Sequence, residues 1–373
     1  MRLLPTSMVK PGMRLGKAIT AEDGKVLLGY NVTLTGNLID KLKKMGYFQL
    51  YIEDARTSDI IIEDALRDDT RVALRNSLLR LFSQLSSPGA ANNFNELKAF
   101  SKAAGQCMSL VMDDLDAKRT TLNDTIMVTR ALRTSTSQIE HFFQNALNVC
   151  VYAVKLGIIL GLTRDEQYTL GLGALFHDIG NTQIPLPLLQ KNTALTSAEF
   201  QKIQKHTEYG FTILKNSPGI PLVAAHCALL HHEKTDGSGY PFGLPGNKVH
   251  PFAKWVGLLD AYDAMTNPRP YRAAIPPDQA LEILFAGAGT LYDKDKVELF
   301  RDKVAIYPLG QDVALSTGQS GIVSKINSSV KHRPTVRVLR NENGEELGIP
   351  YEIDLSQHLH IMIQRVGVDM LVP

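Results

Sequence analysis

The segment Leu170–Gly180 reads LGLGALFHDIG and combines an apolar helical pattern with an adjacent histidine and aspartate. The apolar run predicts a buried helix that ends close to Gly180. His177 and Asp178 stand together at the end of that helix. There an imidazole nitrogen and a carboxylate can reach one cation, and the carboxylate can bridge to a second. Such a pair alone is also typical of a solvated helix end, so its meaning depends on the residues that follow.

Further polar residues of the same kinds come later in the chain. His206 is next, and His231–His232 then ends another apolar helical segment, directly before the glycine-rich stretch 233–241. Asp260 and Asp263 lie three residues apart, which places them on one helix face. If these side chains were buried without a metal, several polar groups would stay unpaired, at about 1–3 kcal/mol each. We therefore expect a shared site for two metal ions.

Three motifs in this region resemble the HD-GYP branch of the HD phosphohydrolase superfamily. They read HDIG at 177–180, HHEKTDGSGYP at 231–241 and DAYDAMTNPRPYR at 260–272, in the order of that family. The resemblance covers residues 137–304 and implies a helical core with two or three divalent ions, iron or manganese. It implies hydrolysis of cyclic di-GMP in bacterial second-messenger signalling. It also implies a diguanylate cyclase-type partner domain.

The resemblance assigns a role to each matching side chain. Asp178 would bridge two ions and Asp260 would complete the site, and both are counted as catalytic. The full set of metal ligands would be His177, Asp178, His206, His231, His232 and Asp260. The substrate contacts would be Asn181, Gly239, Tyr240, Pro241, Asp263, Arg269 and Arg272, although Arg272 is equally compatible with a surface cation. Glu233 has no assigned role and is compatible with a hydrogen bond to a ligand histidine. His226 and His250 match no ligand position, so we expect structural or solvent-facing roles for them.

Two positions depart from the family pattern. Asn145 stands where the family has a ligand histidine, and an amide oxygen binds first-row transition metals less well than imidazole does. His141 lies one turn earlier on the same helix face, so it is compatible with an added ligand and also with an ordinary exposed histidine. Asn181 replaces a lysine, which removes a positive charge from the phosphate contacts.

These departures leave several functions open. The first is a cyclic di-GMP phosphodiesterase with intact or impaired activity. The second is a degenerate module with little or no activity that binds cyclic di-GMP or a partner protein. The third is an enzyme that hydrolyses another nucleotide phosphoester.

Length and composition limit the class of protein. The chain has 373 residues, 44% of them hydrophobic, and a formal net charge of +2. It is long enough for two or three domains, and its near-neutral charge argues against bulk binding of nucleic acid. The three cysteines form no CxxC pair, the N-terminus lacks a signal-peptide pattern and no apolar run is long enough to span a membrane. We therefore expect a cytoplasmic protein.

The whole pattern predicts a mainly α protein with an all-helical metal core and two small flanking domains. Residues 1–60 predict a small α/β domain, and residues 61–136 predict a helical connector that packs within the chain or forms a homodimer. The connector includes helices predicted over 62–85 and 123–135. Residues 137–304 predict the helical metallohydrolase domain. Residues 305–373, with alternating valines and a Glu-Asn-Gly turn at 342–344, predict a small β-rich domain.

Overall fold

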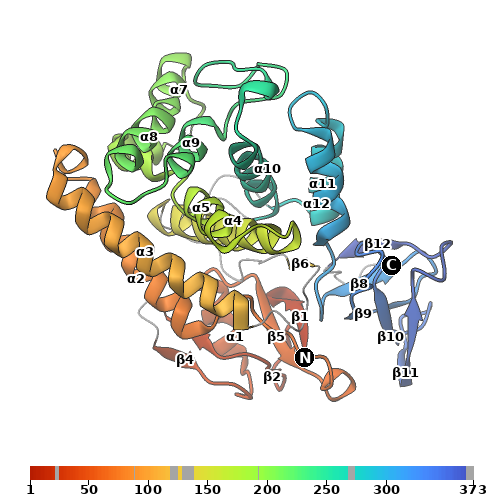
Figure 1. Cartoon of the computed structure of the whole chain (residues 1–373). Coiled ribbons are helices and arrows are strands. Elements are labelled where there is room, and N and C mark those ends of the chain that lie inside the picture. The colour runs from red at the N-terminus through yellow and green to blue at the C-terminus, as the bar shows by residue number, and fades with distance from the viewer. Residues whose placement is uncertain are drawn as a thin grey trace. The chain divides into compact units, whose positions relative to one another are not determined.

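The structure is a computed structural model that describes residues 1–21, 25–87, 89–117, 125–127, 138–191, 193–267 and 274–366. The described residues divide into two compact units (Figure 1). The helical unit comprises those of Ala65–Ile126 and Ser135–Arg301, and the mixed unit combines those of Met1–Asp64, Met127–Thr134 and Asp302–Pro373. The fold is mainly helical, with a small N-terminal α/β part and a C-terminal sheet, which confirms the predicted fold class. The predicted domain boundaries at residues 60, 136 and 304 stay predictions.

The N-terminal part of the mixed unit contains short strands around one helix. These elements are β1 (Arg2–Pro5), β2 (Arg14–Leu15), β3 (Ile19–Thr20), β4 (Val26–Leu28), α1 (Gly36–Lys44) and β5 (Gln49–Glu53). Strands β1, β5 and β2 form an antiparallel sheet in that order, and β3 pairs with β4. The Thr35 side chain accepts a hydrogen bond from the Leu38 amide and so begins α1. The predicted turn at residues 22–24 lies outside the described residues.

The C-terminal part of the mixed unit is a five-stranded antiparallel sheet. Its order is β11-β10-β9-β8-β12. The strands of this part are β7 (Val304–Ala305), β8 (Asp312–Leu315), β9 (Ser320–Lys325), β10 (Thr335–Arg340), β11 (Glu346–Asp354) and β12 (Ile363–Val366). Val336 and Val338 alternate into the core, and Gly344 adopts a positive φ of 79° in the turn between β10 and β11. The predicted strands and turn are therefore present.

The two ends of the chain share one core within the mixed unit. Buried Ile60 packs with Ile322 and Leu339. The Arg337 guanidinium donates to both oxygens of the Asp59 carboxylate, at 2.6 and 2.7 Å. The first and last parts of the sequence therefore fold as one unit, although more than two hundred residues separate them.

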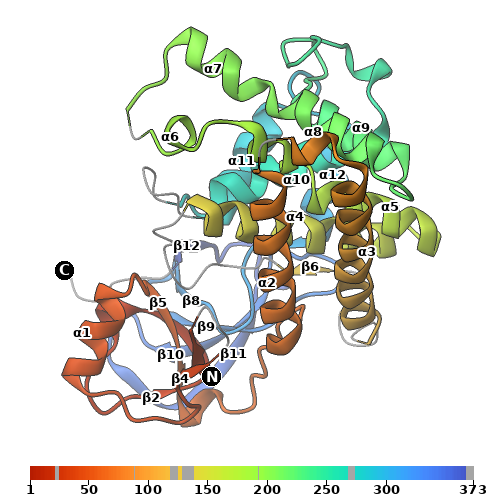
Figure 2. The same ribbon diagram turned by 90° about the vertical axis from the view of Figure 1, so that its left-hand side faces the viewer.

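The helical unit begins with two long helices that lie side by side (Figure 2). These are α2 (Asp68–Leu85) and α3 (Phe94–Ala117), and their leucine faces are buried within the chain. The helix predicted from residue 62 starts only at Asp68, after Arg67 in extended conformation. The helix predicted over 123–135 is wrong at Ile126–Met127, which form strand β6, and most of its other residues lie outside the described ones. The predicted dimer through 61–136 stays a prediction.

The remaining helices form the core that carries the polar motifs. They are α4 (Gln138–Ile159), α5 (Arg164–Leu175), α6 (Leu186–Leu189), α7 (Ser197–Gln204), α8 (His206–Asn216), α9 (Leu222–Leu230), α10 (Pro251–Thr266), α11 (Pro277–Ala286) and α12 (Lys294–Lys303). Among the described residues, α4 alone is long and apolar enough to cross a membrane, over Glu140–Ile159. Of that window, 78% is buried in the protein, which is typical of a core helix. The three cysteines are buried and unbridged.

Candidate metal centre

Three helix ends bring the histidines to one place. His177 and Asp178 follow the end of α5, His206 is the first residue of α8, and His231–His232 follows the end of α9. Helix α9 packs against both α5 and α8 (Figure 1). The carboxyl ends of α5 and α9 carry partial negative charge, so the backbone itself favours a cation at this point.

Two glycines permit the close approach of these helix ends. A Cβ atom on Gly180 would lie 1.9 Å from the carbonyl oxygen of His206. A Cβ atom on Gly257, in α10, would lie 2.1 Å from the carbonyl oxygen of His231. Both distances are shorter than any side chain allows, so only glycine lets the backbone reach these two histidines.

Asp178 lies at the centre of the cluster. Its Oδ1 atom is 3.1 Å from Nε2 of His206 and 3.7 Å from Nε2 of His231, and its Oδ2 atom is 3.6 Å from Nε2 of His177. The Nε2 atom of His177 is also 3.6 Å from Oδ1 of Asp260. Candidate ligand atoms of Asp178, His206, His231 and His232 all lie within 4.8 Å of one another. Each oxygen of the Asp178 carboxylate therefore lies near at least one histidine nitrogen.

Backbone carbonyls fix the orientation of three imidazoles. Nδ1 of His177 lies 2.8 Å from the Ala174 oxygen, and Nδ1 of His206 lies 2.8 Å from the Ile203 oxygen. Nδ1 of His231 meets carbonyl oxygens of α9 in the same way, at 3.0 and 3.1 Å. Because a carbonyl oxygen only accepts, each Nδ1 carries a proton, and Nε2 is the nitrogen that remains to bind a metal.

The Nε2 atoms of these three histidines lie in buried space. His177, His206 and His231 are at most 3% exposed, and their Nε2 atoms are buried without a hydrogen-bond partner. Each such atom costs about 1–3 kcal/mol if it stays unsatisfied. Nitrogen and carboxylate donors suit iron, manganese or zinc. The residues present therefore fit a divalent metal site, with Asp178 between its two halves.

The neighbouring charges set the protonation of the cluster. Burial acts against the charged form of Asp178, but His177 and His206 hold its pKa well below the usual range. Burial likewise opposes ionisation of Asp260, and His177 lowers its pKa. Burial lowers the pKa of His231 and, more strongly, that of His232. At neutral pH the carboxylates are charged and these two imidazoles are neutral, which are the forms that bind metals. Burial opposes the charged form of His177, but Asp178 and Asp260 raise its pKa to about 9, so a metal at this position would displace a proton from the ring.

Asn145 reaches the site through its amide nitrogen. Its Nδ2 atom donates to Oδ1 of Asp260 at 3.1 Å and to Oδ2 of Asp263 at 2.9 Å. Asn148 and Asn267 donate to Oδ1 of Asp263 at 2.9 and 2.8 Å, so three side-chain amides hold this buried carboxylate. In this arrangement Asn145 positions Asp260, and its role as a ligand stays a prediction.

The Gly-Tyr-Pro loop folds over the cluster. The Tyr240 ring stacks on the His232 ring, with centroids 4.6 Å apart and planes 29° apart. Burial raises the pKa of Tyr240, and the negative charges of Asp178 and Asp260 add to this effect. A Cβ atom on Gly239 would lie 2.5 Å from the His232 carbonyl oxygen, which shows how closely the loop backbone approaches. Pro241 follows Tyr240 directly in this loop.

Glu233 holds this loop rather than a histidine. Its two carboxylate oxygens accept hydrogen bonds from the backbone amides of Phe242 and Leu244, each at 2.8 Å. The expected bond to a ligand histidine is therefore wrong. Glu233 immediately follows the histidine pair in sequence. The loop after it folds back, so the backbone amides of Phe242 and Leu244 reach its carboxylate.

The other predicted residues are placed less directly. His141 is half-buried on α4, one turn before Asn145, and Asn181 is buried in the 3-10 turn Ile179–Gln183. Arg269 and Arg272 lie outside the described residues. The expected structural roles of the two remaining histidines of the region agree with their contacts. Nδ1 of His250 accepts from the Phe252 amide at the start of α10, and the ring of His226 contacts Phe211.

Two residues near the site were not among the predicted site residues. Lys234 belongs to the second motif, and its ammonium group lies 4.7 Å from the centre of the Tyr292 ring. Phe200 is an exposed aromatic residue of α7 whose ring lies 6.1 Å from the Tyr240 ring. An unexplained lysine inside a motif is a signal that sequence analysis can use.

Comparisons with known proteins identify the parts of the chain. Residues 132–295 match an HD domain, and residues 313–368 match a KOW domain associated with the HD domain. A cyclic di-GMP phosphodiesterase of Pseudomonas aeruginosa, PA4108, is 31% identical over 199 residues, which are 53% of this chain and 48% of the relative. The 3'3'-cGAMP-specific phosphodiesterase 3 of Vibrio cholerae is 34% identical over 161 residues, which are 43% of this chain and 35% of the relative.

A solved structure, the HDG"Y"P protein Bd1817 of Bdellovibrio bacteriovorus, has a TM-score of 0.47 and 17% identity. The match covers 80% of this chain and 98% of that one. The chain spans about half the length, or less, of the curated relatives it matches. The motif order, the geometry of the histidine cluster and the matches to the domain models and curated relatives agree: residues 132–295 are similar to the HD domain, and residues 313–368 are similar to the KOW domain associated with it.

Proposed function

We propose that this protein is a metal-dependent phosphodiesterase that hydrolyses cyclic di-GMP. The observation that carries the proposal is the buried cluster in which Asp178 lies between His177 on one side and His206 and His231 on the other. Relatives with names of cyclic di-GMP and 3'3'-cGAMP phosphodiesterases support this reaction class.

The proposed ligands divide into two groups that share Asp178. His177 and Asp260 would hold one ion, and His206 and His231–His232 would hold the other. Their nitrogen and carboxylate donors suit iron or manganese, and His141 or Asn145 would add a ligand on the α4 side. When bound, divalent ions lower the pKa of water and stabilise negative charge on a reacting phosphate.

The remaining roles concern the substrate. The loop Gly239–Pro241 covers the cluster through the stacking of Tyr240 on His232, so a bound nucleotide would lie beside it. We assign Asn181 and Asp263 to substrate or loop positioning and Arg269 and Arg272 to the phosphates. Two exposed aromatic side chains, Phe200 and Phe242, flank the loop, and we place the contact with a diguanylate cyclase-type domain there. Such signalling places the protein in the bacterial cytoplasm.

The deciding experiment compares turnover and metal content. The full chain would be loaded anaerobically with Fe(II) or Mn(II) and assayed with cyclic di-GMP and with 3'3'-cGAMP. His231→Ala should lower turnover by about 100-fold and reduce the bound metal, because it removes a ligand. His226→Ala is the matched control, since it removes a histidine of the same helix that contacts Phe211.

The outcomes separate the possible functions. Turnover of cyclic di-GMP that depends on His231 but not on His226 supports the proposal. Faster turnover of 3'3'-cGAMP would reassign the substrate. Binding of cyclic di-GMP without turnover by the fully loaded protein would replace the enzyme with a nucleotide-binding module.

A further inference from the structure

A lysine beside the cluster has no acidic partner in the described part of the chain. Lys234 follows Glu233 directly, and its ammonium group lies over the face of the Tyr292 ring, 4.7 Å from the ring centre. A cation–π contact of this kind orients the ammonium group without an ion pair, and the charges of Asp260 and Asp236 act on it only from a distance. Lysine at a half-buried position is usually paired, so this one needs an explanation.

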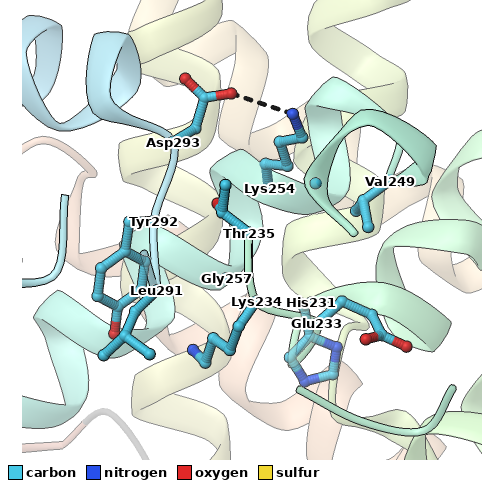
Figure 3. A pocket seen from close by; sticks show the side chains of 11 residues that line it. His231, Glu233, Lys234, Thr235, Val249, Lys254, Gly257, Leu291, Tyr292 and Asp293 are labelled. Carbon is cyan, nitrogen blue, oxygen red and sulfur yellow. Dashed lines mark hydrogen bonds and ion pairs between the residues drawn. The ribbon is translucent and has the colours of Figure 1, made fainter. Parts of the chain in front are cut away.

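The lysine lines a pocket next to the metal ligands (Figure 3). His231, Lys234, Lys254, Tyr292 and Asp293 are among the residues that line it. His231 belongs both to this pocket and to the metal cluster, so the pocket adjoins the cluster.

A second lysine of the same pocket is neutralised. The ammonium group of Lys254 lies 3.0 Å from a carboxylate oxygen of Asp293, and Figure 3 shows this pair apart from Lys234. Of these two lysines, Lys254 has its charge neutralised by an ion pair, and Lys234 does not. Lys234 is therefore the better placed of the two to bind an anion.

The backbone holds Lys234 and Tyr292 in register. The amide of Thr235 donates to the Leu291 oxygen at 3.3 Å, and the amide of Asp236 donates to the Thr290 oxygen at 2.8 Å. The loop that carries the lysine is therefore bonded to the loop that carries the aromatic ring. The cation is placed before any ligand arrives, which reduces the entropic cost of binding.

The pair also lies within the electrostatic reach of the cluster. Burial lowers the pKa of Lys234, and the negative charge of Asp260 acts in the opposite direction. The same carboxylate adds to the effect of burial in raising the pKa of Tyr292. Lys234 is thus beside the metal ligands without being one of them.

We propose that Lys234, supported by Tyr292, binds the phosphodiester of the cyclic dinucleotide that is not being cleaved. This inference rests on the proposed function. A cyclic dinucleotide carries two negatively charged phosphodiesters, and the metal cluster would engage the one that reacts. A cation outside the cluster would stabilise the other, and the ammonium group of Lys234, which forms no ion pair among the described residues, is suited to this. A residue that binds the non-reacting part of a substrate affects binding more than the chemical step.

The test uses three variants of the metal-loaded full chain. Lys234→Gln removes the charge, Lys234→Arg keeps it, and Lys215→Gln is the matched control, because that ammonium group also lies over an aromatic ring, that of Phe211, but outside the pocket. We expect Lys234→Gln to raise KM and Kd for cyclic di-GMP about tenfold, with kcat within about twofold of the wild type. Lys234→Arg should restore most of the affinity, and Lys215→Gln should leave it unchanged. Wild-type KM should also rise with salt more steeply than that of Lys234→Gln, because only the wild type makes this ionic contact.

Each result decides one claim. If Lys234→Gln behaves like Lys215→Gln while the wild type turns over cyclic di-GMP, the role of Lys234 is wrong and the proposed function stands. If cyclic di-GMP binds in a Lys234-dependent way without turnover, the role of Lys234 stands and the enzyme assignment is wrong. If the wild type neither binds nor hydrolyses cyclic di-GMP, both are wrong. An equal fall in kcat and metal content for Lys234→Gln would show a structural role and overturn the inference.

Discussion

The side-chain amide of Asn145 donates a hydrogen bond to Asp260 at 3.1 Å and so connects α4 to α10 at the edge of the metal cluster. The same nitrogen donates to Asp263 at 2.9 Å. One amide therefore orients a candidate metal ligand and a second, buried carboxylate together. Asn145, which departs from the family pattern, is thus bonded to the site, and its replacement should change the affinity for metal.

Asn145→His should increase the affinity for metal. An imidazole is a better ligand than an amide for first-row transition metals, and this position faces Asp260. We expect more metal per chain after loading and removal of excess metal, together with higher turnover, both measured against the wild type. Asn145→Leu serves as the control, because it removes the amide and supplies no ligand. It should lower the free energy of unfolding by about 1–3 kcal/mol, since two carboxylates lose a donor. Equal metal content in the histidine and leucine variants would contradict this prediction.

Gly180→Ala should destroy the cluster. The new Cβ atom would lie 1.9 Å from the His206 carbonyl oxygen, so the start of α8 must move away from Asp178. We expect a loss of at least about 3 kcal/mol in the free energy of unfolding and a loss of bound metal. The control is Gly105→Ala in α3, where the nearest atom to the new Cβ is 3.5 Å away. That change should stabilise the helix by about 0.5–1 kcal/mol. Urea unfolding and metal analysis of both variants check the pair of expectations.

Glu233→Gln should loosen the Gly-Tyr-Pro loop. The carboxylate accepts from the Phe242 and Leu244 amides, whereas the Gln side chain offers one oxygen and places an NH₂ group against the second amide. We expect the free energy of unfolding to fall by about 1–3 kcal/mol and the exchange of these two amide hydrogens to accelerate. Glu208→Gln, on the exposed face of α8, should change the free energy of unfolding by less than about 0.5 kcal/mol. Unchanged hydrogen exchange at Phe242 and Leu244 would rule out this role for Glu233.

Asp312 should make the mixed unit less stable as the pH rises. Its side chain is fully buried, neither oxygen has a hydrogen-bond partner, and burial raises its pKa to about 7, although Arg2 and Arg340 act in the other direction. The folded protein holds this proton up to about pH 7, whereas an unfolded aspartate releases it near pH 4, at about 3.9. Stability from this group is therefore complete below pH 4 and is lost as the pH approaches 7, by at most about 1.4 kcal/mol per pH unit.

Asp312→Asn should remove this part of the pH dependence, because an amide does not titrate. Urea unfolding of both proteins at pH 5, 6, 7 and 8 measures the difference in slope. If the two slopes agree, the Asp312 carboxyl group is charged in the folded protein and the assignment fails.

The sequence predicted the helical metal core because its motifs depend on local geometry. His177 and Asp178 are adjacent in sequence, and a close backbone contact requires Gly180 two residues later. The motif can therefore be recognised from one short stretch of sequence. The strands of the C-terminal sheet were also predicted, since alternation of Val336 and Val338 reflects a sheet with one buried face. The cluster of Asp178 with three histidines agrees with the expected grouping, whereas the individual ligand roles remain predictions.

Features that depend on distant segments were not predictable. Glu233 was expected to bond a histidine, but its partners are amides of a loop that returns to it nine and eleven residues later. The start of α2 at Asp68 and the strand at Ile126–Met127 contradict local helix propensity, because tertiary context overrides weak preferences. The shared core of Ile60, Ile322 and Leu339 joins segments that are far apart in the sequence, and no local pattern predicts that they pack together.

The carbonyl contacts of His177, His206 and His231 have a consequence for how the protein acquires its metal. In each case the oxygen that holds Nδ1 belongs to the backbone three or four residues earlier, so the local fold at a helix end aims the imidazole. Folding therefore orients these side chains, and metal binding does not have to restrict the rotamers of three flexible histidines. Uptake and release of metal should leave the ligand side chains in the same conformation. The apoprotein should keep its secondary structure through repeated cycles of chelation and reloading, in contrast to small domains that fold only around their metal.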